Sequence, residues 1–513
     1  MKAKNKIIHE TTRNDTKEQA SFVSFRVVSW ILQRQHEART PLRARAGLAA
    51  FIVLALFTAH SMEARGQQKT ASGKPDAAAV QRGDDLSALG EAVGLLQSGQ
   101  LDKAEPIVRG VLKRSPQNAD AHNLLGAILD QRGQSQDAER EYRAALRLNP
   151  KSASALANLG VLLARTKRGD EAVKIFETVL KEIPGHPQAT LNLGLLYAER
   201  GEYSLAFPLL ERANAQRPNT FIILYNLGVA LYQLNRLDDA SAAFEAAAAL
   251  APDNPELVYY LGLVADARGE SEAAAELWEK ALALRPNFAE ANFMLGELLR
   301  KNGRTEGARQ YYERALAEDP SKLVYYVRLG GVYMVLDLYA QALEIFQRAA
   351  VRFPAVAEAH YFVGIAARGR AAYDLSEAAL RKSLALKAEN ADALAQLGFI
   401  VGELGRYVEA EQLLRRAIAL GEKHFYAHYD LGRILVKTRR YEEAIPVLER
   451  GAILRPNNPG VHYQLFMAFT RLKRKTEAER ELALFKQFEE ERKKRGRDEE
   501  EAQNVSADAP KIP

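Results

Sequence analysis

The chain has 513 residues, with 71 Lys and Arg against 65 Asp and Glu and a formal net charge of +6. Residues 1–45 hold ten Lys or Arg and four Asp or Glu, an excess of six that equals the net charge of the whole chain. The rest is formally neutral and lacks the concentrated basic face of a nucleic-acid-binding protein, so we expect no nucleic-acid partner. The sequence contains no cysteine, which excludes disulfides, thiolate metal sites and cysteine nucleophiles.

The N-terminal part of the chain contains an apolar segment between two polar stretches. Residues 47–59 are almost wholly apolar, residues 1–46 form a basic leader, and residues 60–84 are a linker rich in Gly, Gln, Ser, Lys and Asp. A basic flank, a short apolar run and small residues after it are typical of an export signal. The apolar run is also shorter than the about 20 residues that a membrane-spanning helix needs.

We therefore expect a signal peptide and an exported, periplasmic protein. One alternative is a membrane protein in which residues 47–59 are retained as a tether. The other is a buried or interfacial helix in a cytoplasmic protein. The sequence does not decide whether the apolar segment is cleaved.

From residue 85 the chain repeats itself with a period of 34 residues. Alanine stands twelve places after the glycine of most copies, with Ser376 once in its place, and proline usually stands 24 places after it. A fixed period of this length indicates one supersecondary unit stacked on copies of itself. The pattern predicts twelve units over residues 85–492, followed by a charged, disordered tail at residues 493–513. The glycines that define the period are Gly126, Gly160, Gly194, Gly228, Gly262, Gly296, Gly330, Gly364, Gly398 and Gly432.

Each unit is predicted to be a helix hairpin. Residues 153–166 and 170–182 both carry apolar side chains at helical spacing, with a turn between them. Pro184 ends the second helix, because proline disfavours helix in the residue before it and has no N–H to donate. Gly160 on the first helix and Ala172 on the second add no side-chain bulk, so the two helices are predicted to approach closely.

The chain resembles the tetratricopeptide repeat family. The 34-residue period, the recurring alanine and proline, and Leu-Gly pairs such as Leu159-Gly160 match the pattern of that family. The resemblance implies an all-α fold, a right-handed superhelical solenoid of helix-turn-helix hairpins whose first helices line a concave face. It also implies that the partners are proteins or peptide segments, and it leaves the oligomeric state open.

Two rows of side chains on the first helices, asparagines and aromatic residues, and arginines in the later repeats are predicted to contact a bound peptide. Asparagine amides can bond an extended backbone of any sequence, aromatic rings offer a large contact area, and arginines suit an acidic segment or a terminal carboxylate. In a second interpretation, the asparagines stabilise the helix stack and the rings pack against the neighbouring unit. The predicted peptide-binding residues are Asn158, Asn192, Asn226, Tyr225, Tyr259, Phe293, Tyr361, Tyr429, Tyr463, Arg328 and Arg433.

The histidines do not indicate a catalytic or metal site. His122, His360, His428 and His462 share one position of the repeat, where other copies have leucine or tyrosine, and this indicates packing. The sequence has no phosphate-binding loop of the Gly-x-x-x-x-Gly-Lys-Ser/Thr type and no Gly-x-Ser-x-Gly elbow. We expect no catalytic residue, no cofactor and no bound metal.

The sequence thus predicts a non-catalytic scaffold that binds extended segments of partner proteins on the concave face of the array. One alternative is an assembly factor of envelope polysaccharide or secretion machinery. A further alternative is an accessory subunit of an enzyme, such as an array associated with a glycosyltransferase.

Overall fold

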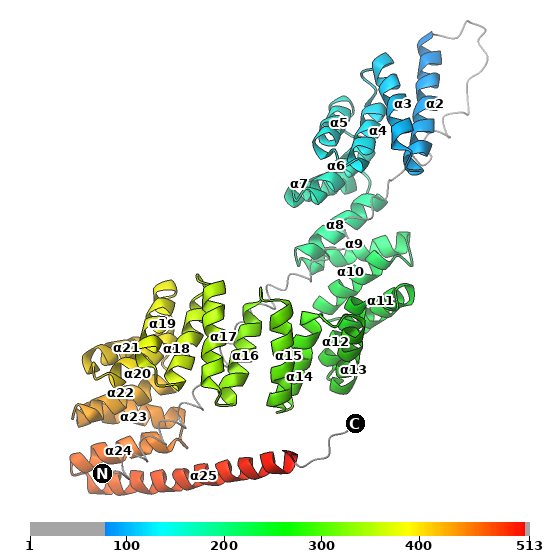
Figure 1. Cartoon of the computed structure of the whole chain (residues 1–513). Coiled ribbons are helices and arrows are strands. Elements are labelled where there is room, and N and C mark those ends of the chain that lie inside the picture. Colours follow the sequence, from blue (N-terminus) through cyan, green and yellow to red (C-terminus); the bar gives the residue numbers. More distant parts are fainter. Residues whose placement is uncertain (1–76, 508–513) are drawn as a thin grey trace. The chain divides into compact units, whose positions relative to one another are not determined.

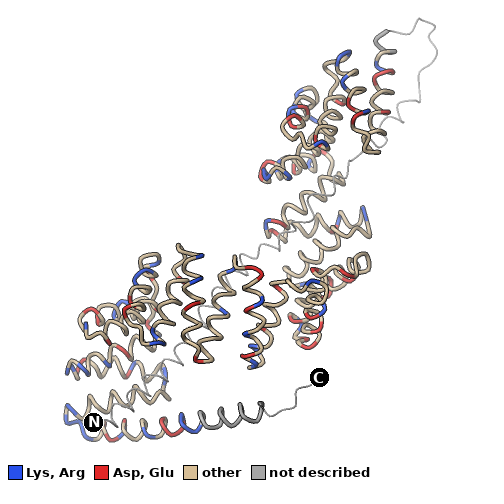
Figure 2. Tube along the Cα trace, viewed as in Figure 1, with Lys and Arg blue, Asp and Glu red and all other residues tan. Residues whose placement is uncertain are grey.

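The computed structural model describes residues 77–507 (Figure 1). Over these residues the chain forms twenty-four helices, α2 to α25, and no strand. The predicted all-α fold, a helical repeat solenoid, is confirmed. Acidic and basic residues are interspersed along the array (Figure 2). The leader at residues 1–46, the apolar segment at residues 47–59 and most of the predicted linker lie outside the described residues.

Residues 77–286 belong to one compact unit, here called the N-terminal unit. Its hairpins each consist of an even-numbered first helix and an odd-numbered second helix, and the second helix also packs against the first helix of the next hairpin. The helices of this unit are α2 (Ala77–Gln97), α3 (Leu101–Arg114), α4 (Ala119–Gln131), α5 (Ser135–Leu148), α6 (Ala153–Arg165), α7 (Gly169–Glu182), α8 (Pro187–Glu199), α9 (Tyr203–Gln216), α10 (Phe221–Gln233), α11 (Leu237–Leu250), α12 (Pro255–Arg268) and α13 (Ser271–Leu284).

Residues 287–507 belong to the second compact unit, here called the C-terminal unit. It repeats the same alternation of first and second helices. Its helices are α14 (Ala289–Lys301), α15 (Thr305–Glu318), α16 (Leu323–Val335), α17 (Tyr339–Arg352), α18 (Ala357–Gly369), α19 (Tyr373–Leu386), α20 (Ala391–Glu403), α21 (Tyr407–Leu420), α22 (Phe425–Lys437), α23 (Tyr441–Leu454), α24 (Pro459–Arg471) and α25 (Lys475–Ala507).

One residue in the left-handed backbone conformation marks the turn inside each described hairpin. Such a residue recurs every 34 positions from Gly99 to Lys473, and half of these residues are not glycine. Glycine adopts a positive φ without steric cost, whereas other L-residues lose about 1–2 kcal/mol there. The left-handed turn conformation therefore recurs with the 34-residue period in every described hairpin, including those in which the turn residue is not glycine.

The repeated glycine of the first helix lies against a ring or a leucine of the second helix. A Cβ at Gly160 would lie 2.7 Å from Phe176 Cε1, and a Cβ at Gly262 would lie 2.5 Å from Trp278 Nε1. The predicted close approach is thus present, but the group that fills the space is the side chain sixteen places after the glycine. The sequence analysis named only the small residues of this contact, such as Ala172.

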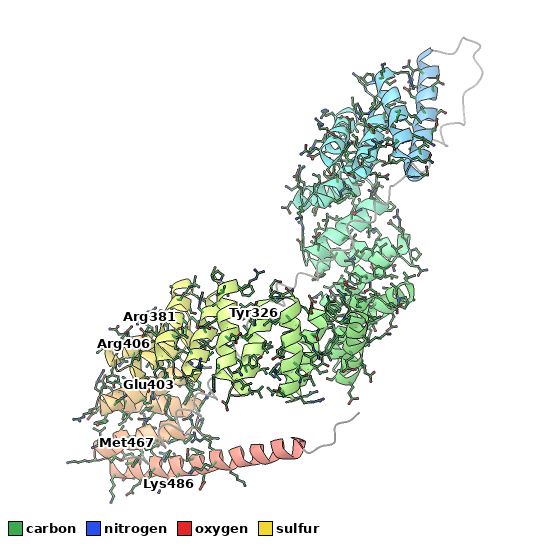
Figure 3. The ribbon with its side chains drawn as sticks, in the orientation of Figure 1. Tyr326, Arg381, Glu403, Arg406, Met467 and Lys486 are labelled. Carbon is green, nitrogen blue, oxygen red and sulfur yellow. The ribbon has the colours of Figure 1, made fainter. Side chains whose placement is uncertain are left out.

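Partly exposed charged side chains join the second helices of neighbouring hairpins. In the C-terminal unit, Arg381 on α19 and Arg406 before α21, both labelled in Figure 3, each pair with Glu377 and Glu409. Because two arginines share two carboxylates from adjacent hairpins, each ring of four charges links two repeats. One hairpin later the same ring is formed by Glu411, Arg415, Arg440 and Glu443.

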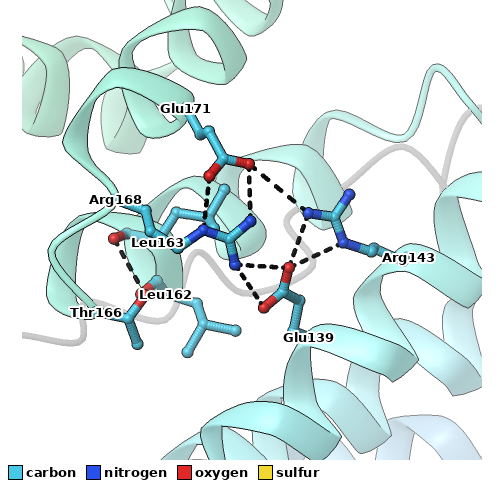
Figure 4. Close-up of polar contacts among 7 residues, drawn as sticks. All are labelled: Glu139, Arg143, Leu162, Leu163, Thr166, Arg168 and Glu171. Atoms are coloured by element: carbon cyan, nitrogen blue, oxygen red, sulfur yellow. Dashed lines mark hydrogen bonds and ion pairs between the residues drawn. The ribbon is translucent and has the colours of Figure 1, made fainter.

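The N-terminal unit contains an equivalent ring (Figure 4). Arg168 Nη1 lies 2.8 Å from Glu139 Oε2 on α5, and Arg168 Nε lies 2.6 Å from Glu171 Oε1 on α7. Arg143 pairs with Glu139 at 2.7 Å. The hydrogen bonds from Arg168 lower the pKa of the Glu171 carboxyl group, so the ring stays charged at neutral pH.

Helices extend past the predicted repeat bounds at both ends. Helix α2 begins at Ala77, inside the predicted linker, where three consecutive alanines favour helix. Helix α25 continues to Ala507, inside the predicted disordered tail.

Candidate functional site

The predicted asparagine row lies on three successive first helices, α6, α8 and α10, of the N-terminal unit. All three side chains are half-buried. Asn158 Nδ2 donates to Asn123 Oδ1 on α4 at 3.1 Å, so amides of adjacent hairpins are in direct contact. Asn192 and Asn226 each donate to a backbone carbonyl of their own helix at 2.8 Å. The contact of these three side chains with a peptide stays a prediction.

The predicted aromatic row mainly packs repeats together. Tyr259, Tyr361 and Tyr429 are buried, and Tyr225 and Phe293 are half-buried. Their rings contact rings of the same or the next hairpin: the Tyr225 and Tyr260 centroids are 5.7 Å apart, and those of Phe293 and Tyr325 are 4.9 Å apart.

Tyr463 is the exception in this row, because 38% of it is exposed. Its ring centroid lies 5.3 Å from that of Phe485 on α25. The packing interpretation, which the sequence analysis left open, thus describes most of the row, and Tyr463 retains the largest surface for a partner.

Both predicted arginines are already paired with carboxylates. Arg328 Nε lies 2.6 Å from Glu297 Oε1, and Arg328 Nη2 donates to Glu297 Oε2 at 2.9 Å, so a buried two-point ion pair joins α16 to α14. The hydroxyl of Tyr312 donates to the same carboxylate. Arg433 on α22 pairs with Glu403 on α20 at 2.8 Å. Arg328 is therefore a link between hairpins rather than an open cation.

The sequence analysis missed the carboxylates of these ion pairs, although the sequence contains a signal for them. Glu403 precedes Arg433 by 30 residues, and Asp238 precedes its partner Arg268 by the same interval. An interval of 30 residues is four short of one period. Because positions four apart lie on one face of a helix, side chains separated by 30 residues can meet across adjacent hairpins. Glu297 precedes Arg328 by a similar interval of 31 residues.

A polar cluster lies on three successive first helices of the C-terminal unit, α18, α20 and α22. We call it the Arg368 cluster; its other members are Gln396, Phe399, Glu403, Asp430 and Arg433. Arg368 Nη1 donates to Gln396 Oε1, and its guanidinium carbon lies 4.4 Å from the centroid of the Phe399 ring. The guanidinium carbon of Arg433 lies 4.9 Å from the same ring. Glu403, labelled in Figure 3, contributes a carboxylate that pairs with Arg433.

Asp430 is the buried carboxyl group of the Arg368 cluster. Its Oδ1 lies 3.5 Å from Arg433 Nε. Burial raises the pKa of Asp430 to about 6, and the nearby charges of Arg433 and Arg368 oppose that shift. The cluster thus combines two permanent cations, one carboxylate and one carboxyl group that gains a proton in mildly acidic solution.

The histidines have the structural roles that their shared position indicates. Nε2 of His360 and of His428 each lies 3.0 Å from the backbone carbonyl oxygen six residues earlier. His424 Nδ1 accepts from the Ala427 N–H at 3.1 Å and caps α22, and Nε2 then faces Asp392 at 3.0 Å. Within residues 77–507, no group of three or more His, Cys, Asp or Glu side chains is arranged to hold a metal ion. No helix in the same range is long and apolar enough to cross a membrane.

The repeats match two tetratricopeptide repeat models and one larger domain model. The first covers residues 89–138, 128–187, 170–219 and 191–255, the second covers residues 255–280, and the C-terminal domain of cilia and flagella-associated protein 70 matches residues 271–507. The chain belongs to the tetratricopeptide repeat family. Members of this family typically serve as protein-binding scaffolds without catalysis.

Solved structures with similar folds include several repeat proteins, and no curated protein matches the chain. The APC/C hetero-tetramer Cut9–Hcn1 is 15% identical with a TM-score of 0.40, over 77% of this chain and 92% of the other. Yeast Tom70 is 15% identical with a TM-score of 0.34, over 78% and 97%. PilF of Pseudomonas aeruginosa is 22% identical with a TM-score of 0.38, over 42% and 99%.

Proposed function

We propose that this protein is a non-catalytic scaffold whose first helices hold extended segments of partner proteins. The proposal rests on one observation. Asn158 Nδ2 on α6 donates to Asn123 Oδ1 on α4 at 3.1 Å, so amide side chains of two adjacent first helices meet, one position out of the 34-residue register. The predicted row itself, Asn158, Asn192 and Asn226, keeps the spacing of 34 residues. A row of amides in constant register can bond successive peptide groups of an extended chain.

The test is a binding assay with an array of short peptides. The triple variant Asn158→Ala, Asn192→Ala and Asn226→Ala should lose saturable binding while keeping its helical circular dichroism. Asn149→Ala is the matched control, because Asn149 is an exposed asparagine of the same unit, in the turn after α5. The scaffold proposal fails if the triple variant binds as the parent protein does, or if no peptide binds the parent protein.

We further propose that the array works outside the cytoplasm, exported or tethered through residues 47–59. The sequence pattern of a basic leader, an apolar run and small residues supports this location. An array held there could assemble envelope polysaccharide or secretion machinery. Cell fractionation tests the location: recovery of the full-length chain, with residues 1–59 intact, from the soluble cytoplasmic fraction would contradict it.

A further inference from the structure

Three successive first helices of the N-terminal unit have almost no charged residue. Residues 153–164 of α6, 187–198 of α8 and 221–233 of α10 contain no Asp, Glu, Lys or Arg, although such residues make up 27% of the chain. In Figure 2, α8 and α10 are accordingly drawn almost wholly in tan. The first helices on either side, α4 and α12, each carry two carboxylates. The uncharged region is therefore confined to three hairpins.

Apolar side chains of these helices lie beside the asparagine row and are partly open to solvent. Val161 and Leu195 each stand three residues after an asparagine of the row, Leu191 stands four before Leu195, and Ile222 stands four before Asn226. Residues three or four apart share a face of a helix. All four apolar side chains are half-buried, and α8 contacts both α6 and α10. We call Val161, Leu191, Leu195 and Ile222 the apolar stripe.

The asparagine row offers acceptors rather than donors. Asn158 uses its Nδ2 in the bond to Asn123, and Asn192 and Asn226 use theirs in bonds to backbone carbonyls. Within the described residues, no hydrogen bond reaches Oδ1 of any of the three. An amide oxygen can only accept, so each side chain retains an acceptor for a donor such as a peptide N–H.

We propose that α6, α8 and α10 bind a segment whose core is apolar, uncharged and free of proline. This inference rests on the proposed scaffold function and names the class of segment that the N-terminal unit takes. The three Oδ1 atoms accept backbone N–H groups, which proline lacks, and the apolar stripe covers the segment's side chains. A charged residue in the core would lose hydration, and these helices offer no opposite charge to replace it.

The extent of the uncharged region limits the length of that core. Axes of directly packed helices are about 8–10 Å apart. An extended chain advances about 3.3 Å per residue. Three neighbouring first helices therefore match a core of roughly six or seven residues. Charged residues are tolerated only outside that core.

The experiment uses the full chain and an array of short peptides in matched forms. Each peptide that binds is also presented with one core apolar residue changed to Asp, with the same residue changed to Lys, and with one core N–H methylated. We expect a charge of either sign to weaken affinity about tenfold or more. Methylation, which removes one hydrogen-bond donor, should weaken it about fivefold. A loss for both signs of charge distinguishes an uncharged site from a charged one.

Leu195→Asp tests the apolar stripe directly. This variant should weaken binding of the apolar peptides about tenfold, and its affinity for the lysine form should rise relative to that of the parent chain. Leu195→Asn, which adds no charge, should also weaken binding and serves if the aspartate variant does not fold. The matched control is Leu205→Asp on α9 of the same unit, where the leucine is 50% exposed, and it should bind as the parent does.

The outcomes separate this inference from the scaffold proposal. Binding peptides with charged cores, or equal losses in the Leu195 variants and the Leu205 control, leave the scaffold in place and overturn the apolar site. If no peptide binds the parent chain, both proposals are wrong. If, in addition, light scattering shows an oligomer that Leu195→Asp dissociates, the stripe is a contact between copies of this chain.

Discussion

Arg168 Nη1 lies 2.8 Å from Glu139 Oε2, and this ion pair ties the start of α7 to α5 of the preceding hairpin (Figure 4). The same relationship recurs between Arg440 and Glu411, which are 29 residues apart like Arg168 and Glu139. Repeat arrays are held together by interfaces between neighbouring units, so charges at these interfaces add to the coupling of adjacent hairpins.

Arg168→Gln should lower the melting temperature slightly at low salt, and the difference from the parent should shrink at high salt. The pair is near the surface, where dissolved ions screen the attraction. Thermal melts at several sodium chloride concentrations measure this. Arg304→Gln is the control, because Ala275 occupies in that repeat the place of Glu139. A salt-independent loss in Arg168→Gln would contradict the electrostatic explanation.

Gly160→Ala should destabilise the N-terminal unit by roughly 1–3 kcal/mol, the range for an overpacked core. The new methyl group would lie 2.7 Å from the Phe176 ring, which is itself fully buried and cannot move aside. Urea unfolding followed by circular dichroism measures the loss.

Gly94→Ala is the matched control for that substitution. Gly94 lies within α2 of the same unit, and a Cβ there meets no atom within 4 Å. Alanine favours helix over glycine by about 0.5–1 kcal/mol, so this variant should be more stable than the parent. Equal effects of the two substitutions would show that helix propensity, and not the contact with Phe176, decides the result.

The fold was predictable because its determinants lie within one period. Gly160, Ala172 and Pro184 fix a hairpin locally, and copies of a hairpin can bury their apolar faces only by stacking. The ends were less predictable. Helices α2 and α25 extend past the repeat pattern, and the period of the sequence gives no signal for these extensions.

The candidate site was less predictable than the fold, because its properties depend on pairs of residues in different repeats. The sequence identified Arg328 and Arg433 as candidate cations for a partner. In the structure they are already paired with Glu297 and Glu403, which stand about 30 residues earlier in the chain. Arg368 appears as one more basic residue in the sequence. Arg368 is buried over the Phe399 ring, and its hydrogen-bond partner in the next hairpin is the neutral amide of Gln396.

Ala371→Gly should stabilise the C-terminal unit by about 1 kcal/mol, because Ala371 has a φ of 57° in the turn between α18 and α19. The reciprocal substitution Gly405→Ala, at the equivalent place of the next hairpin with a φ of 84°, should destabilise it by a similar amount. Space does not interfere, since a Cβ at Gly405 meets no atom within 4 Å. Urea midpoints that move in the same direction for both variants would exclude backbone strain as the cause.

The contact between α24 and α25 should weaken as the pH rises above neutrality. His462 Nδ1 lies 2.6 Å from Glu481 Oε2 on α25, and His462 Nε2 lies 2.6 Å from the Pro456 carbonyl oxygen. Burial disfavours the imidazolium, but the bonds to Glu481 and Pro456 outweigh it and raise the pKa of His462, while Arg480 acts weakly against them. The folded state therefore holds this proton more tightly than the unfolded chain does.

The sign of the pH effect follows from that difference. Below the pKa of an unfolded histidine, near 6.5, both states are protonated and the full stabilisation is present; it is lost as the pH rises through the higher folded pKa. Hydrogen exchange, corrected for the intrinsic rate, should show protection of the residues of α25 next to α24 falling as the pH rises above about 6.5. Burial lowers the pKa of His428, so the contribution of that group to stability changes with pH in the opposite sense. The measurement must therefore be local to α25 rather than global. His462→Gln should remove the pH dependence, and persistence of the same dependence in that variant would assign it to another group.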